Sequence, residues 1–462
     1  MLAFSIIAYL LINLGVGFWA SRRISTTSDF VLAGRSLPLF LAASATFATW
    51  FGSETVMGAP TEFIEKGMQG IIEDPFGAAL CLFLVGIFFA RRLYSMNIIT
   101  FCDFFKIRFG RSAELLSAML IIPSYFSWIA AQLLAMGIVL KVLLGWSIVS
   151  CILLSSVVVV LYTIWGGMWS ISITDFVQTV MIILGLLIVS ISLYLKIDDL
   201  KILTKDTPPD FFRFLPPPDF KSYVAYFAAW ITIGLGSIPQ QDVFQRVMSA
   251  KSASVSVKAT LLSSVLYFTV ALLPIFIGYT GTKLYPEMAK QGQMIIPNMI
   301  LLHTSLPIQI LFFGALVSAI LSTTSSAIMA PATVLGENIV KFFRPDLSDK
   351  QLLNIIRIGI LVITLSCIYM ATTSESIFDL VAESSAFSLV SLFVPLAAGV
   401  YWKRASQAGS LISMTSGLAV WLLCSFVGTE YPSLIYGLLS SLGGMLLGSF
   451  LIKPKTEPAG KI

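Results

Sequence analysis

The sequence predicts an all-α integral membrane protein with about 13 transmembrane helices. Of its 462 residues, 57% are hydrophobic and only 11% are charged, whereas soluble domains carry about 25% charged residues. The apolar residues gather in runs of about twenty, which is the helix length that spans a bilayer. These runs lie near 2–20, 38–60, 72–93, 114–143, 147–165, 171–195, 222–241, 259–281, 309–336, 352–372, 379–401, 408–428 and 431–452.

The first apolar run and the loops between the runs predict how the chain is oriented in the membrane. No basic segment precedes the first run and no cleavage motif follows it, so we expect a retained helix and not a signal peptide. The longest loop, 196–221, is rich in proline and is expected to be a cap or linker. Most basic residues, Arg246 among them, fall in loops on one side if the N-terminus is outside. The positive-inside rule then predicts a multi-pass protein of the plasma (inner) membrane with a cytoplasmic C-terminus.

Two of the predicted helices are broken at corresponding places. The second helix is interrupted at 51–53 by Gly52, and the seventh at 234–239 by two glycines and Pro239. Glycines can also serve close helix packing. However, paired breaks five helices apart are typical of the binding site of a transporter built from two repeats.

Polar groups inside these runs indicate where a cation binds. Ser318, Ser322, Ser325 and Ser326 share one face of the ninth helix, which could be packing alone or a cluster of oxygen ligands. Hydroxyls and carbonyls suit a hard cation such as sodium. Asp175 lies one turn into the sixth helix with no basic residue nearby in sequence. A bound cation is its expected partner, and a structural hydrogen bond is the alternative.

Other residues suggest a solute pocket. Glu54 follows the first break and is interpreted as a charge in that pocket, or else as a protonated side chain bonded to freed backbone. Glu73 and Asp74 are interpreted as solvated loop residues. Tryptophans near cavity-facing segments, which suit an ammonium group through cation–π attraction, are Trp50, Trp128 and Trp230.

With these residues in place, the chain resembles the sodium:solute symporter family along nearly its whole length. The resemblance rests on the stretches 28–37, 166–178 and 319–326. It implies LeuT-type inverted five-helix repeats with one extra helix before them and two after. The single transporter domain 1–462 then divides into a leading helix and loop (1–37), an inverted-repeat core (38–402) and two trailing helices with a short cytoplasmic tail (403–462).

The resemblance also implies roles for individual residues. A main sodium site would use Ala48, Phe51, Ala319, Ser322 and Thr323. A second sodium site would use Asp175, Ser322, Ser325 and Ser326. Within the family the likeness is strongest to the high-affinity choline transporter branch, where two tryptophans lining the choline site match Trp50 and Trp128. The third such position is Gln240, which favours a hydrogen-bonding solute.

We therefore expect sodium-coupled symport of a small organic solute, with a choline-like ammonium, a zwitterion or an amino acid favoured. The alternatives are a sodium symporter for a carboxylate or other polar metabolite, a proton-coupled carrier, or a non-transporting sensor or channel on the same scaffold. An enzyme is not expected, because the single histidine and scattered cysteines offer no acid/base pair or metal cluster. The expected partners are the solute, sodium and the lipid bilayer, with no nucleic acid. No protein partner is predictable.

Overall fold

The computed structural model describes residues 1–21 and 26–451. Within these residues the regular structure is helical, apart from one β-bridge between Leu37 and Ala250. Part of the predicted leading loop and nearly all of the predicted cytoplasmic tail (452–462) lie outside the described residues. The all-α membrane fold is therefore confirmed.

Every predicted span coincides with helix, and several spans consist of two helices joined by a π-helical segment or a break. They are α1 (Leu2–Ser21), α3 (Leu39–Trp50) with α4 (Ala59–Lys66), α5 (Ala78–Leu84) with α6 (Ala90–Ser95), α8 (Arg111–Ser124) with α9 (Phe126–Leu144), α10 (Ile148–Tyr194), α11 (Phe220–Gly236) with α12 (Gln241–Ser249), α13 (Ala253–Leu284), α15 (Leu306–Val334), α17 (Asp349–Thr373), α18 (Ile377–Ser388) with α19 (Val394–Tyr401), α20 (Gln407–Val427) and α21 (Ser433–Leu451). The shorter helices are α2 (Thr27–Leu32), α7 (Phe101–Phe109), α14 (Ile295–His303) and α16 (Lys341–Phe343).

The number of membrane crossings stays a prediction. α10 contains both the fifth and the sixth predicted spans. The two spans meet at a bend in the backbone at Gly167, where φ is +53°. In the described part of the chain, ten helices are long and apolar enough to cross a membrane. One of the ten, Glu54–Ser95, contains the segments on both sides of Gly67, and α3, with 12 residues, is too short to be among them. The ten helices establish a multi-pass protein without fixing the count of 13.

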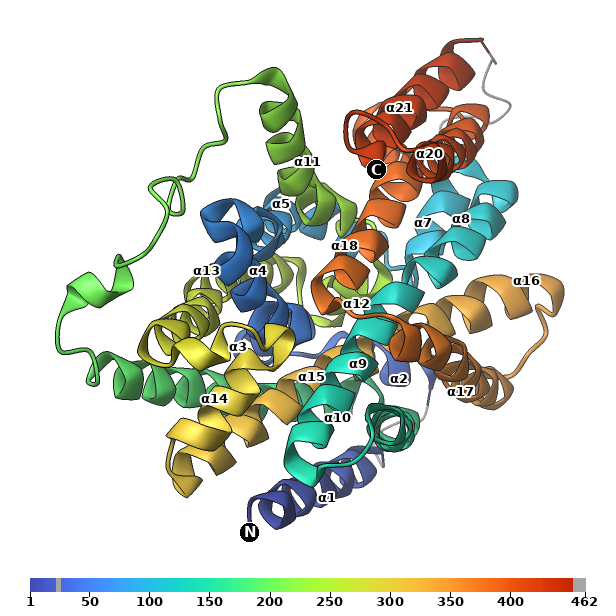
Figure 1. Cartoon of the computed structure of the whole chain (residues 1–462). Helices are drawn as coiled ribbons and strands as arrows, with labels where there is room; N and C mark the ends of the chain where they lie inside the picture. Colours follow the sequence, from blue (N-terminus) through green and yellow to red (C-terminus); the bar gives the residue numbers. More distant parts are fainter. Residues whose placement is uncertain (22–25, 452–462) are drawn as a thin grey trace.

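The helices form a central group with additions on opposite sides (Figure 1). α3, α10 and α15 contact one another, α13 contacts α3 and α10, and α15 is buried without interruption from Phe312 to Val334. α1 packs on α10 and α15, whereas α20 and α21 pack on each other at the far edge, where α20 contacts α8 and α21 contacts α19. One helix thus lies outside the core at the N-terminal end and two at the C-terminal end. The domain boundaries 37/38 and 402/403 stay a prediction.

The long loop after α10 runs over the outside of the bundle to α11 (Figure 1). It is fastened through several of its own backbone carbonyls and through phenylalanine rings, such as Phe211 on Phe63 and Phe214 on Phe76. The Phe211 carbonyl accepts from the Met68 amide at 2.8 Å, and the Lys205 carbonyl accepts from the Lys283 ammonium at 2.7 Å. The Gln69 side chain donates to two further loop carbonyls, at 2.9 and 2.5 Å. The loop therefore holds both α13 and the turn after α4, as expected of a cap.

A polar network joins α7 to the ends of other helices. The Asn338 amide nitrogen donates to Asp103 at 3.1 Å and to Glu114 at 3.2 Å, and its oxygen accepts from the Thr100 hydroxyl at 2.7 Å. The side chain of Gln241, at the start of α12, accepts from the first backbone amide of α7 at 2.7 Å. One buried asparagine thus ties the consecutive helices α7 and α8 to the end of the segment that follows α15, which is distant from them in sequence.

Candidate functional site

The first break lies where the sequence predicts it, between α3 and the π-helical segment Glu54–Gly58. Gly52 occupies a space with no room for a side chain. A Cβ atom there would lie 2.6 Å from a Glu54 carboxylate oxygen and 3.1 Å from the Gln132 amide nitrogen. Gln132 in turn accepts from the Ser53 amide at 3.2 Å and donates to Glu54 at 2.7 Å. A buried side chain from α9 therefore satisfies a backbone group that the break sets free.

The second break separates α11 from α12 at 237–240. A Cβ atom at Gly236 would collide with the Ser385 carbonyl of α18, so glycine permits the close approach of these two helices. The Ser237 and Ser385 hydroxyls are hydrogen-bonded at 2.9 Å across this contact. The paired breaks are therefore real features of the backbone, and each is packed against a partner helix.

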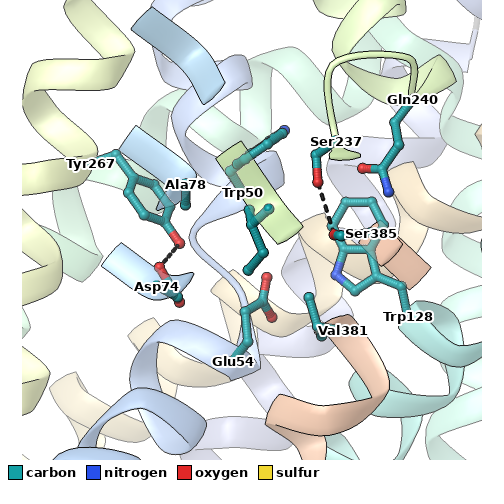
Figure 2. A pocket seen from close by; sticks show the side chains of 11 residues that line it. Trp50, Glu54, Asp74, Ala78, Trp128, Ser237, Gln240, Tyr267, Val381 and Ser385 are labelled. Atoms are coloured by element: carbon teal, nitrogen blue, oxygen red, sulfur yellow. Dashed lines mark hydrogen bonds between the residues drawn. The ribbon is translucent and has the colours of Figure 1, made fainter. Parts of the chain in front are cut away.

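All four predicted solute-binding residues line one buried cavity: Trp50, Glu54, Trp128 and Gln240 (Figure 2). The cavity lies between the two breaks. Its volume is about 20 Å³, which is room for about one water molecule. An organic solute thus requires the walls to separate. The four residues come from three segments distant in sequence, so their convergence was not fixed by any local pattern.

Two further cavity residues were not recognised from the sequence. The interpretation of Asp74 as a solvated loop residue is wrong, because its side chain is fully buried and lines the cavity. It accepts from the Thr55 hydroxyl at 2.9 Å and from the Tyr267 hydroxyl at 2.7 Å, as Figure 2 shows for the tyrosine. The Tyr267 ring meets the Trp50 ring edge to face, with centroids 6.5 Å apart. The only sequence signal was an acid immediately before a proline inside an apolar run.

Not every suggested residue belongs to this cavity. Trp230 lies in a separate aromatic cluster, with ring centroids 6.1 Å from Phe76 and 6.3 Å from Phe214. Glu73 is only partly buried and faces a neighbouring cavity. Gln240 does face the solute cavity, and its amide nitrogen lies 3.5 Å from the Ser384 hydroxyl of α18.

The residues implied for the main sodium site are all fully buried where α3 meets α15: Ala48, Phe51, Ala319, Ser322 and Thr323. The Thr323 hydroxyl donates to the Ala48 carbonyl at 3.0 Å, which links the first broken helix to α15. Phe51 has non-helical backbone angles, so its carbonyl lies outside the regular helix. The arrangement thus offers carbonyl and hydroxyl oxygens of the kind that sodium accepts.

The residues implied for a second sodium site are also buried, but an arginine lies among them. Ser322 donates a hydrogen bond to Asp175, and Ser326 accepts one from Arg246. The Arg246 guanidinium lies 4.0 Å from the Asp175 carboxylate, and both side chains are at most 1% exposed. Ser325 instead donates to the carbonyl of Leu321 in its own helix at 2.7 Å. Three of the four predicted residues therefore meet around a guanidinium.

The placement of Arg246 in an inner loop is consequently wrong. Arg246 belongs to α12, and its Nε donates to the Thr49 hydroxyl of α3 at 2.7 Å. Asp242, one turn earlier, is fully buried and accepts from the Tyr125 hydroxyl. Asp175 therefore has a basic partner 71 residues further along the chain, which no pattern of sequence neighbours indicates.

A comparison with known families decides the class. The model of the sodium:solute symporter family matches residues 30–417. The chain belongs to the sodium:solute symporter family. The family assignment and the likeness to the choline transporter branch are both confirmed. The chain is a transporter and not an enzyme, and it is a sodium-coupled solute symporter that spans the membrane several times.

Relatives of this symporter carry different solutes. The high-affinity choline transporter 1 of Drosophila melanogaster is 30% identical over 90% of this chain and 70% of its own length. The high-affinity proline transporter PutP of Bacillus subtilis (strain 168) is 26% identical over 96% of this chain and 95% of its own. A solved Na+-coupled sialic acid symporter has a TM-score of 0.84 and 20% identity, covering 99% of this chain and 98% of its own. That likeness supports the predicted LeuT-type fold.

Proposed function

We propose that this symporter couples sodium entry to uptake of a small organic solute with a positively charged nitrogen: a choline-like ammonium, a zwitterion or an amino acid. One observation carries the proposal, namely that Trp50, Glu54, Trp128 and Gln240 converge on one buried cavity between two broken helices. Ring faces beside a carboxylate attract such a nitrogen. Relatives named for choline and for proline transport are consistent with this class.

The proposed mechanism is alternating access in the plasma membrane, with the N-terminus outside and the C-terminus in the cytoplasm. Sodium would bind among Ala48, Phe51, Ala319, Ser322 and Thr323 and hold α3 against α15. Its loss to a low-sodium cytoplasm would let that contact slip and open the inner side of the cavity. The Thr323–Ala48 hydrogen bond supports this, because it places the two helices in direct polar contact.

The sodium gradient is sufficient for such coupling. A tenfold concentration ratio provides about 1.4 kcal/mol, and a potential of about 100 mV adds about 2.3 kcal/mol per charge. One sodium ion then supports roughly a few-hundredfold accumulation of a neutral solute. The Asp175–Arg246 ion pair favours one sodium per cycle over two, since the guanidinium already neutralises the only acid of the second site.

A first experiment measures thermal stability of the purified protein in sodium and in potassium with choline, betaine, proline, a sugar and a monocarboxylate. We expect a nitrogen-containing solute to stabilise the protein only in sodium. A sodium-dependent hit with the monocarboxylate or the sugar alone would favour the alternative of a polar metabolite. The absence of any sodium effect would contradict the proposed coupling.

A matched pair of variants tests the sodium site itself. Thr323→Val removes the hydroxyl that reaches Ala48, whereas Thr324→Val removes a buried hydroxyl that bonds only within α15. In the proposed site the Thr323 hydroxyl oxygen is itself a sodium ligand, so its loss removes one of the oxygens that would hold the ion. We therefore expect Thr323→Val to raise the sodium concentration for half-maximal stabilisation at least about tenfold. Equal effects of the two variants would contradict the assignment of Thr323.

A further inference from the structure

The charge of the solute cavity is one-sided. Its lining contains two carboxylates, Glu54 and Asp74, and no lysine, arginine or histidine. Glu54 is 4% exposed and Asp74 is fully buried. Among the described residues, no ion pair reaches either acid within 4.0 Å. Two acids therefore share a buried space without a resident cation.

Neutral side chains donate the hydrogen bonds that the structure shows to these two acids. Glu54 accepts from the Gln132 amide at 2.7 Å. Asp74 accepts from the hydroxyls of Thr55 and Tyr267. Neutral donors stabilise a carboxylate but do not balance its charge, and each carboxylate oxygen keeps capacity for a further hydrogen bond. A positively charged ligand is the group that can supply both.

The aromatic walls favour the same charge. Trp50, Trp128 and Tyr267 each line the cavity and are at most 5% exposed. Ring faces attract cations most strongly when water is excluded. A solute that carries a carboxylate of its own would find no basic residue in the cavity lining to pair with. Its carboxylate would lie beside Glu54 and Asp74, and like charges placed together are strongly unfavourable.

The remaining wall distinguishes between kinds of cation. Opposite Asp74, the cavity presents the hydrogen-bonded hydroxyls of Ser237 and Ser385 and the side-chain amide of Gln240, as Figure 2 shows. A quaternary ammonium has no N–H and gains nothing from acceptors of this kind. A primary ammonium or a guanidinium donates several hydrogen bonds. The acceptors thus favour a cation that carries N–H groups.

The neighbouring cavity has the same sign of charge. It measures about 180 Å³ and is lined by Glu62, Glu73 and Asp379 with a single base, Lys66. Lys66 is paired with Glu62 at 2.6 Å, so two acids are left over. Glu73 directly precedes Asp74, and α18 contributes to both cavities. Clefts lined by one sign of charge concentrate ions of the opposite sign.

We infer that the cavity selects organic cations that bear N–H groups and lack a carboxylate, with short diamines as the best-fitting class. Two carboxylates in one cavity match two ammonium groups, and the aromatic rings match the methylene chain between them. The inference rests on the proposed sodium-coupled uptake and narrows its solute class: it excludes zwitterions and ranks choline below primary amines.

The test uses the full-length protein in detergent and measures binding of 1,4-diaminobutane, butylamine, choline and proline, each in sodium and in potassium. We expect 1,4-diaminobutane to bind in sodium at least tenfold more tightly than choline, and proline not to bind. Tighter binding of proline or choline would overturn the inference while leaving sodium coupling intact. Sodium stabilisation without amine binding would also overturn it. The loss of every sodium effect would instead refute the proposed function beneath it.

Isosteric variants test the two acids. Glu54→Gln and Asp74→Asn keep the shapes and remove the charges, and each is expected to weaken diamine binding at least tenfold. Glu383→Gln is the matched control, because Glu383 is exposed on α18 and does not line either cavity. Unchanged diamine binding in both cavity variants would overturn the inference. The comparison of solutes on the unaltered protein keeps the test decisive if a variant fails to fold.

Discussion

The ion pair between Asp175 and Arg246 supports a quantitative prediction. At 4.0 Å, two opposite charges attract by about 4 kcal/mol at an effective dielectric constant of about 20. Removing one partner leaves the other charged and buried, which destabilises a protein by about 3–5 kcal/mol. We therefore expect Asp175→Asn to lower the free energy of unfolding by about 3–5 kcal/mol in potassium as well as in sodium, because the partner is part of the chain.

A surface pair in the same chain is the control. Asp210 and Arg213 lie 3.7 Å apart, but the Asp210 side chain is 83% exposed. Exposed pairs contribute about 0–1 kcal/mol. Asp210→Asn should therefore lower the free energy of unfolding by less than about 1 kcal/mol, although its two charged groups are closer.

The assay is unfolding in mixed micelles for Asp175→Asn, Arg246→Gln and the double variant. The sum of the two single-variant losses in free energy of unfolding should exceed the loss in the double variant by about 2–3 kcal/mol. This difference is the coupling energy between the two side chains. A coupling energy near zero would refute the conclusion that Asp175 and Arg246 stabilise each other as an ion pair. A loss for Asp175→Asn that occurs in sodium only would show that a bound ion, and not Arg246, neutralises the acid.

Three further predictions concern single side chains. Ser322→Ala should raise the sodium concentration for half-maximal stabilisation by about tenfold, and an unchanged sodium requirement would contradict the site. Gly52→Ala should lower the free energy of unfolding by about 1–3 kcal/mol through overpacking. The control Gly443→Ala, at a position with open space around its Cβ, should change the free energy of unfolding by less than about 1 kcal/mol. Similar values for the two variants would contradict the tight fit at the break. Asn338→Leu should lower the free energy of unfolding by about 1–3 kcal/mol, because it removes the hydrogen bonds to α7 and α8. An unchanged free energy of unfolding in a urea or detergent titration would contradict a structural role for this network.

The sequence predicted those features that depend on local pattern. Runs of apolar residues located the helices, and glycines within them located both breaks, because bilayer thickness and backbone sterics act on short segments. The hydroxyl face of α15 followed from helical spacing alone. Trp50 and Glu54 were recognised as cavity residues because they flank a break.

The missed residues depend on packing between distant segments. Asp74 stands at the very start of the third predicted span, where an acid is usually solvated, and its burial and its bonds to Thr55 and Tyr267 depend on segments distant in sequence. Arg246 belongs to the polar α12, which resembles a loop in composition but lies against α3 and α15. Tyr267 is one of two tyrosines in the long apolar helix α13, and no spacing distinguishes it from a packing residue.

The loop between α10 and α11 has a consequence for how it can vary. Five of its hydrogen bonds to the bundle use main-chain carbonyls, those of Leu203, Lys205, Phe211, Arg213 and Phe214. Every amino acid supplies the same carbonyl, so most substitutions at loop positions other than Phe211, Phe212 and Phe214, whose rings pack on the bundle, should leave these hydrogen bonds in place. Removal of residues would instead shift the carbonyls out of register with Met68, Gln69 and Lys283. Outside these three phenylalanines, the loop is therefore expected to tolerate most substitutions but not changes in its length.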